Sequence, residues 1–120
     1  MEKINLAEKF TLFSECWSPK IAAQVDDYAV KLVKLQGAFD WHKHDDEDEM
    51  FLDVSGVMHI DFRDRRETLH PGEFIVVPKG VEHCPCAEGI CEAVVFERNT
   101  VVNTGDNTAS AFTVRDLERI

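Results

Sequence analysis

Three histidines and one glutamate, drawn from two segments of the chain, have the residue types of a metal site. The first segment supplies His42, His44 and Glu49, and the second supplies His83. Imidazole nitrogens and a carboxylate oxygen suit Mn, Fe, Co, Ni or Zn. Because the two segments are well separated in the sequence, one ion could bind all four residues only in a fold that brings the segments together.

The first two histidines are spaced as neighbours on one face of an extended chain. His42 and His44 are two residues apart, so on a strand both imidazoles point the same way, about 6.5 to 7 Å apart along the strand. That separation suits two ligands of one ion. Taken alone, such a pair is more often two surface histidines than a metal site.

Glu49 is the last of five consecutive acids, Asp45 to Glu49. Such a run is usually a solvated loop or face, and we assign its first four members to the rim of the site, where they would attract cations. Glu49 differs because it leads into the apolar stretch 50–54, which predicts a strand with Glu49, Phe51 and Asp53 on one face.

Two further carboxylates are candidates for chemistry beside a metal. A buried Asp53 would need water, a hydrogen-bond donor or a metal-bound group to offset its burial, so we consider it a candidate general base. A bulge after Glu49 would instead turn Asp53 outward. Glu97, at the end of another predicted strand, is a similar candidate with less support.

The cysteines offer an alternative zinc site made of His83, Cys84, Cys86 and Cys91. Their C-x-C-x4-C spacing lacks the C-x2-C pattern of structural zinc sites. If the segment is extended, Cys84 and Cys86 lie on the face opposite His83. We therefore expect the cysteines to be free, packing thiols.

The elements that must position these residues are mainly strands. Predicted strands cover 28–36, 49–54, 57–62, 74–77 and 91–97. Turn signals separate or follow them, such as Ser55-Gly56, Pro78-Lys79-Gly80, Glu88-Gly89 and Asn103-Thr104-Gly105-Asp106. Short helices are predicted at both ends. One runs from Leu6 to Phe13 with Asn5 as its cap, and the other runs from Thr113 to the end. Many short strands with regular turns indicate a β-sandwich or barrel.

Composition limits the functions open to the chain. Its 120 residues, 44% of them hydrophobic, suffice for one domain over 1–120, with a barrel core at about 26–100. The formal charge of −10 would repel phosphate backbones, so we expect no nucleic-acid partner. The sequence has no signal peptide and no apolar stretch long enough to span a membrane, so we expect a cytoplasmic protein without a membrane partner.

The full spacing resembles a known family. The pattern Gly37-x4-His42-x-His44-x4-Glu49-x6-Gly56, then fifteen residues, then Gly72-x5-Pro78-x-Gly80-x2-His83 is similar to the two paired motifs of the cupin superfamily. It is particularly similar to those of its short bacterial members labelled mannose-6-phosphate isomerase-like. The resemblance implies an all-β double-stranded β-helix, or jelly-roll, barrel between the two short helices. It also implies a divalent transition metal held by His42, His44, Glu49 and His83, and a homodimer.

Two departures from the family pattern bear on function. One residue fewer than usual lies between Gly37 and His42, and Ala87 stands where the family usually has Asn, which weakens any substrate analogy. The complete ligand set favours a metal-dependent enzyme that acts on a small polar molecule such as a sugar or carboxylate, by isomerase, dioxygenase or decarboxylase chemistry. The short chain and Ala87 favour a non-catalytic cupin that binds a small ligand. A storage protein with an empty barrel is a third hypothesis.

Overall fold

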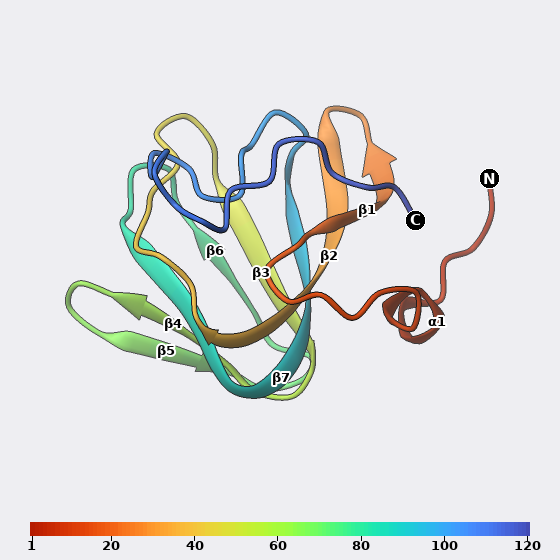
Figure 1. Ribbon diagram of the computed structural model, residues 1–120, viewed down its shortest axis with the longest axis horizontal. Helices are drawn as coiled ribbons and strands as arrows, with labels where there is room; N and C mark the ends of the chain where they lie inside the picture. The colour runs from red at the N-terminus through yellow and green to blue at the C-terminus, as the bar shows by residue number, and fades with distance from the viewer.

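The computed structural model describes residues 1–120 and is built almost entirely of antiparallel strands (Figure 1). One short helix precedes seven strands, which are α1 (Leu6–Phe10), β1 (Lys20–Val25), β2 (Tyr28–Ala38), β3 (Glu49–Ser55), β4 (Met58–Phe62), β5 (Arg66–Leu69), β6 (Phe74–Val77) and β7 (His83–Arg98). The strands form a jelly-roll barrel, as the sequence predicts. No helix has the length and hydropathy that a membrane span requires.

The long strand β7 holds the barrel together. It pairs with β2 over most of its length, with β4 through its first residues and with β3 through its second half. The strand order is therefore β1-β2-β7-β3-β6, with β4 and β5 joined to the other end of β7. β7 therefore pairs with strands from both halves of the barrel, and the loops that lead into those strands lie near its two ends.

The turn predicted at Glu88-Gly89 is a bulge within β7 and does not end a strand. Leu35 pairs with Cys91 and Gly37 pairs with Ala87, so three residues of β7 lie opposite one residue of β2. These three residues are exposed. The chain bends there and continues, because a bulge accommodates extra residues while the ladder resumes beyond it.

Alternation along the strands separates an inner core from an outer cluster. The inner core joins buried apolar side chains from all of the strands β2 to β7 around Phe51, Met58 and Ile60. On the outer face, Phe10 packs with Leu32, Val94 and Phe13 of the second cluster. Polar side chains that point inward are therefore surrounded by apolar walls, which sets the environment of the candidate site.

The N-terminal helix is confirmed, although it is shorter than predicted. Its cap is Asn5, whose side-chain oxygen accepts a hydrogen bond from the Glu8 backbone N–H at 3.0 Å. The helix ends at Phe10 because Thr11 and Leu12 form a turn whose N–H groups donate to Glu8 and Lys9. Phe10 is buried against the outer face of the barrel.

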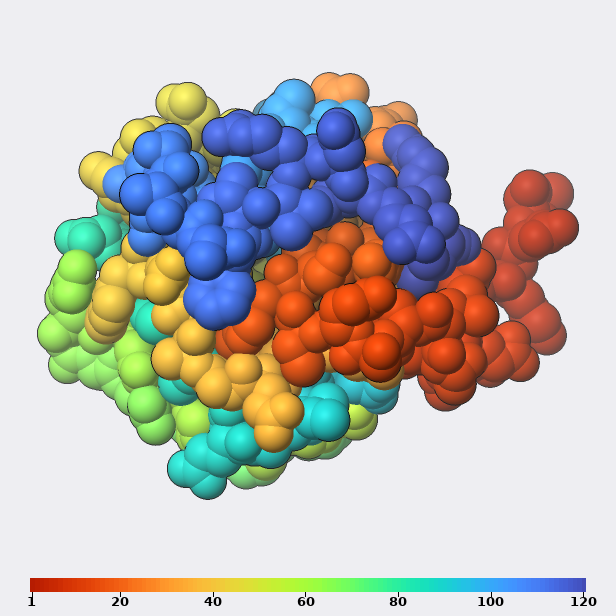
Figure 2. Space-filling model, in the orientation of Figure 1, coloured from red at the N-terminus to blue at the C-terminus, as the bar shows by residue number.

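The predicted C-terminal helix from Thr113 is wrong, because residues 113–120 form no helix and the last three of them lie along β1. The Ile120 N–H donates to the Ile21 carbonyl at 3.0 Å, and Arg119 forms a parallel bridge with Ile21. So short a segment gains little from helical hydrogen bonds alone, and contacts with the barrel determine its conformation. In Figure 2 this segment, in blue, lies beside the orange N-terminal residues across one face of the molecule. Two strands, β1 and β5, are present that the sequence pattern did not predict.

Candidate metal centre

The fold brings the two histidine-bearing segments together inside the barrel. His42 and His44 lie in the loop after β2, Glu49 begins β3, and His83 begins β7. One ligand atom from each of these four residues lies within 4.8 Å of the other three. All four side chains are buried, with at most 6% of any residue exposed.

Backbone pairing fixes the distance between the segments. His42 and His83 form an antiparallel bridge in which each N–H donates to the other's carbonyl, at 3.1 and 2.9 Å. The Gly80 N–H donates to the His44 carbonyl at 2.7 Å. The regular backbone geometry of a β-bridge therefore sets the spacing of His42 and His83, independently of their side chains.

Hydrogen bonds on the far side of two rings determine which nitrogen faces the cluster. His42 Nδ1 lies 2.9 Å from the Asp40 carbonyl oxygen, and His83 Nδ1 lies 2.9 Å from the Val81 carbonyl oxygen. A carbonyl only accepts, so each Nδ1 carries a proton, and Nε2 is the ring nitrogen that faces the cluster. Backbone carbonyls orient metal-binding histidines in this way.

The cluster contains acceptor atoms that face one another. His83 Nε2 lies 3.1 Å from Glu49 Oε1, and His44 Nε2 lies 3.4 Å from the same oxygen. His44 Nε2 has no hydrogen-bond partner. Three imidazole nitrogens and a carboxylate oxygen converge in one buried space, and this donor set fits a divalent transition metal.

The charge states of two residues suit such an ion. Burial, reinforced by neighbouring His83, lowers the pKa of His42 to about 4, so the ring is neutral near pH 7. Burial alone would raise the pKa of Glu49, but its interactions with neighbouring Glu97, His44 and His83 outweigh burial and hold the pKa well below its usual range. Neutral imidazole and ionised carboxylate are the forms that bind metals.

A cavity of about 40 Å³ adjoins the cluster, and His42 and Glu49 form part of its wall. Glu97 also lines it, next to Glu49 in the pairing of β3 with β7. The ammonium of Lys31 lies 2.8 Å from Glu97 Oε1, and both side chains are only 2% exposed. Burial and the nearby Glu49 raise the pKa of Glu97 well above its usual range.

The structure does not bring Asp53 together with the four clustered residues. Asp53 is buried and points inward, but it lies four residues from Glu49, about 13 Å along β3. Its Oδ1 accepts a hydrogen bond from the Cys91 thiol at 3.4 Å, and it does not line the cavity. Of the two candidate carboxylates, only Glu97 lies beside the cluster.

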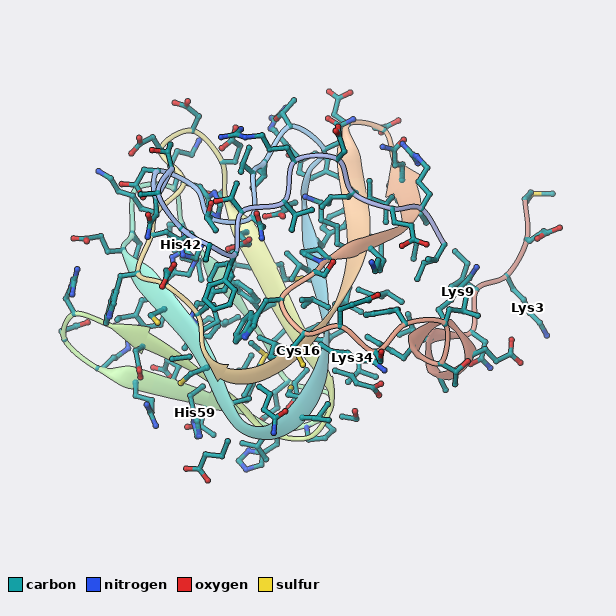
Figure 3. All side chains as sticks on the ribbon, viewed as in Figure 1. Lys3, Lys9, Cys16, Lys34, His42 and His59 are labelled. Atoms are coloured by element: carbon teal, nitrogen blue, oxygen red, sulfur yellow. The ribbon has the colours of Figure 1, made fainter.

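The cysteines and the remaining histidines lie apart from the cluster. All four cysteines are free, and burial raises the pKa of Cys84 to about 11 and that of Cys91 to about 12. His59 lies on the outer side of β4, whereas His42 lies within the barrel (Figure 3). His70 is exposed beside Glu73.

A loop beyond β7 clamps the histidine loop, which the sequence indicated only as a turn. Gly105 has a φ of +54°, and a Cβ on it would lie 2.2 Å from the Lys43 carbonyl oxygen and 3.2 Å from the His42 ring. Asp106 accepts from the Lys43 N–H at 2.9 Å, and its own N–H donates to the Lys43 carbonyl at 3.0 Å. A small residue at position 105 is what allows this close approach.

A jelly-roll barrel with an inward cluster of three histidines and one glutamate defines a cupin that could bind metal. Residues 30–97 match the Cupin_2 family model, described as "Cupin domain". The chain therefore belongs to the cupin family, whose members commonly bind a divalent metal.

Similar proteins agree with this assignment. The chain is 37% identical over 62 residues to "Uncharacterized protein YdbB" of Bacillus subtilis (strain 168), a match that covers 51% of this chain and 55% of that protein. A cupin-2 domain containing protein from Shewanella frigidimarina NCIMB 400 superposes with a TM-score of 0.79 at 47% identity, over 80% of this chain and 94% of that one. Protein NMB1881 from Neisseria meningitidis gives 0.75 at 37% identity, over 82% and 100%.

Proposed function

We propose that this cupin is a metal-dependent enzyme that binds a small molecule directly beside a metal held by His42, His44, Glu49 and His83. The observation that carries the proposal is the cavity next to the cluster, because a purely structural ion would be enclosed by protein on every side. When bound, the metal would polarise an oxygen of the small molecule or acidify a water. Isomerase, dioxygenase and decarboxylase chemistry all use such a site.

The protein's own residues contribute orientation and exclusion of water. The carbonyls of Asp40 and Val81 hold two of the rings, and the loop around Gly105 covers the histidine loop. The stacked rings of Trp17 and Phe39, with centroids 4.8 Å apart, form part of the cavity wall. These contacts keep the donor atoms in place before any ligand arrives, which lowers the cost of binding.

A non-catalytic cupin that binds a small ligand is the second candidate function. Ala87, at the position where the family usually has Asn, is buried in the inner apolar core. No polar side chain from that position is therefore available for chemistry. In this case the metal would orient the ligand without turnover.

Metal content tests both functions. Natively purified protein should contain close to one equivalent of a transition metal, and a His42→Ala/His44→Ala variant should contain almost none. A His59→Ala/His70→Ala variant is the matched control and should keep its metal. Equal metal content in all three proteins would refute the four-residue site. With metal present, product formation in a substrate screen supports the enzyme, and a ligand-dependent rise in Tm without product supports the binding protein.

We further propose that two copies of the chain pair through the outer face of β3 and β6. Met50 lies beside Val76, and Leu52 lies beside Phe74, in the pairing of these strands. Phe74 and Val76 are 61% and 49% exposed on an edge strand. A two-fold interface places a surface against itself, and in a chain of charge −10 this uncharged face can meet its copy without repulsion.

Light scattering after size-exclusion chromatography tests the dimer. The wild-type protein should have twice the chain mass at micromolar concentration, and Phe74→Glu should be a monomer, because it places two like charges at the interface. Ile90→Glu, at the exposed bulge of β7, is the control and should leave the dimer intact. A wild-type monomer would refute the proposal.

A further inference from the structure

The wall of the cavity beside the cluster is mostly apolar. It is lined from strands β2, β3 and β7 by Val33, Leu35, Phe51 and Val95. The neighbouring loops contribute Trp17 and Phe39. A sugar carries a hydroxyl on nearly every carbon, and each buried hydroxyl needs a partner to offset the loss of water. The number of free polar groups in the wall therefore decides what the cavity can hold.

The polar side chains in the wall are largely occupied by other protein groups. Asn103 donates to the Phe112 carbonyl and accepts from the Val114 N–H, both at 2.9 Å. Lys31 donates to Glu97 at 2.8 Å and to the Val101 carbonyl at 3.4 Å. Beyond the four clustered residues, this leaves the second N–H and lone pair of the Asn103 amide, and, next to Glu49, one hydrogen of Lys31 and one oxygen of Glu97.

That free oxygen, Glu97 Oε2, is buried and has no hydrogen-bond partner. Glu97 is 2% exposed, and its other oxygen is held by Lys31. The free oxygen and the remaining hydrogen of Lys31 belong to one ion pair, so they form a single polar spot next to Glu49. A buried group without a partner is costly, and a ligand with one polar group at this spot would satisfy it.

We propose that the site takes a compact molecule with an apolar body and a single oxygen-bearing head, and that it discriminates against sugars. The inference rests on the proposed function, because the head is the part that would meet the metal. The cavity volume of about 40 Å³ has room for about three water-sized groups, which limits the apolar body to a few carbon atoms.

Two hydroxy acids of nearly equal size test the inference. 2-Hydroxyisovalerate and 2,3-dihydroxybutyrate share the same 2-hydroxycarboxylate head and differ by one methyl replaced by a hydroxyl. Binding is measured by titration of cobalt-loaded protein, with the visible spectrum of cobalt(II) as the readout. We expect 2-hydroxyisovalerate to bind about tenfold to a hundredfold more tightly, which is the discrimination an apolar pocket makes against a hydroxyl of equal size.

Two valine variants locate the discrimination. Val95 points into the cavity and Val94 points to the outer cluster, and each is 6% exposed on the same strand. Val95→Thr adds a hydroxyl to the wall and should reduce the preference for 2-hydroxyisovalerate severalfold, whereas Val94→Thr should leave it unchanged. Thermal unfolding of both variants establishes that each is folded.

The outcomes separate this inference from the proposed function. If the protein binds no cobalt, the proposed function fails. If it binds cobalt and both acids, but prefers the dihydroxy acid or binds the two equally, the inference is overturned and the metal-dependent function stands. An equal loss of preference in Val94→Thr and Val95→Thr would also overturn it, because the discrimination would then not arise in the cavity.

Discussion

Replacing Lys31 with methionine should destabilise the metal-free protein by about 3 to 5 kcal/mol near pH 8. Lys31 and Glu97 are 2.8 Å apart and almost fully buried. When both groups are ionised, Coulomb attraction at this distance is about 6 kcal/mol at an effective dielectric constant of 20. Part of this lost attraction is offset, because methionine has no charge to desolvate on folding. The expected net loss of about 3 to 5 kcal/mol is the range measured when one partner of a buried ion pair is removed.

The loss should depend on pH in a defined direction. Burial and neighbouring Glu49 already raise the pKa of Glu97, and removing the ammonium raises it further. Above the ordinary pKa of glutamate, the unfolded chain releases the proton that the folded variant retains. Stability of Lys31→Met therefore falls as pH rises, by at most about 1.4 kcal/mol per pH unit. Wild-type stability stops falling once its Glu97 ionises, whereas the variant keeps losing stability, so the difference between them is larger at pH 8 than at pH 5.

Urea unfolding of chelator-treated protein at pH 5 and pH 8 measures both effects. Lys34→Met is the control. Lys34 is partly buried, donates to the Phe13 carbonyl and has Glu92 3.7 Å away, so it should contribute only about 1 kcal/mol. Lys31→Met/Glu97→Leu should recover most of the lost stability, since no charge is then left buried. A single variant that loses less than about 1 kcal/mol at pH 8, or a double variant less stable than the single one, would refute this account.

Three other predictions follow from the site and its surroundings. The pKa of His42 is about 4 in the folded chain, so as the pH falls the unfolded chain takes up a proton at this residue before the folded chain does. Between pH 7 and pH 5, the unfolding free energy of metal-free wild-type protein should therefore fall by about 2 kcal/mol more than that of His42→Gln. Gly105→Ala should cost at least about 2 kcal/mol and weaken metal binding, measured by urea unfolding and cobalt titration, whereas Gly89→Ala, with open space around it, should be neutral within about 0.5 kcal/mol. Iodoacetamide should label Cys16 well before Cys91 in native protein, as peptide mass mapping would show, and equal rates would contradict the burial of Cys91.

The sequence predicts the strands whose apolar and polar residues alternate or whose apolar runs are bounded by turns. The stretch Phe74–Val77 is found at its predicted limits, and Glu49 takes the inward face together with Phe51. Strands β1 and β5 were not predicted, because Lys20–Val25 and Arg66–Leu69 have little apolar periodicity and depend on their partners. Tertiary context determines such strands more than their own sequence does.

The four clustered residues could be predicted from the spacing of the two motifs. Such a spacing indicates that two distant segments of the chain meet at the same place in the fold. The cavity wall could not be predicted in this way. Glu97 and Lys31 are 66 residues apart, and neither belongs to a motif. Gly105 was visible only as part of a turn, because its close approach to Lys43 depends on how a later loop packs.

The clamp on the histidine loop also sets an order of events during synthesis. All seven strands lie before residue 99, so the whole barrel is translated before Gly105 and Asp106 are added. These residues pack on Lys43, between two of the histidines, some sixty positions earlier in the chain. Chains are made at about 5 to 20 residues per second, so the clamp residues follow the end of β7 within about a second. Covering of the histidine loop is thus the last step in the order of the sequence, and a metal that enters before this step would meet the histidine loop while it is still uncovered.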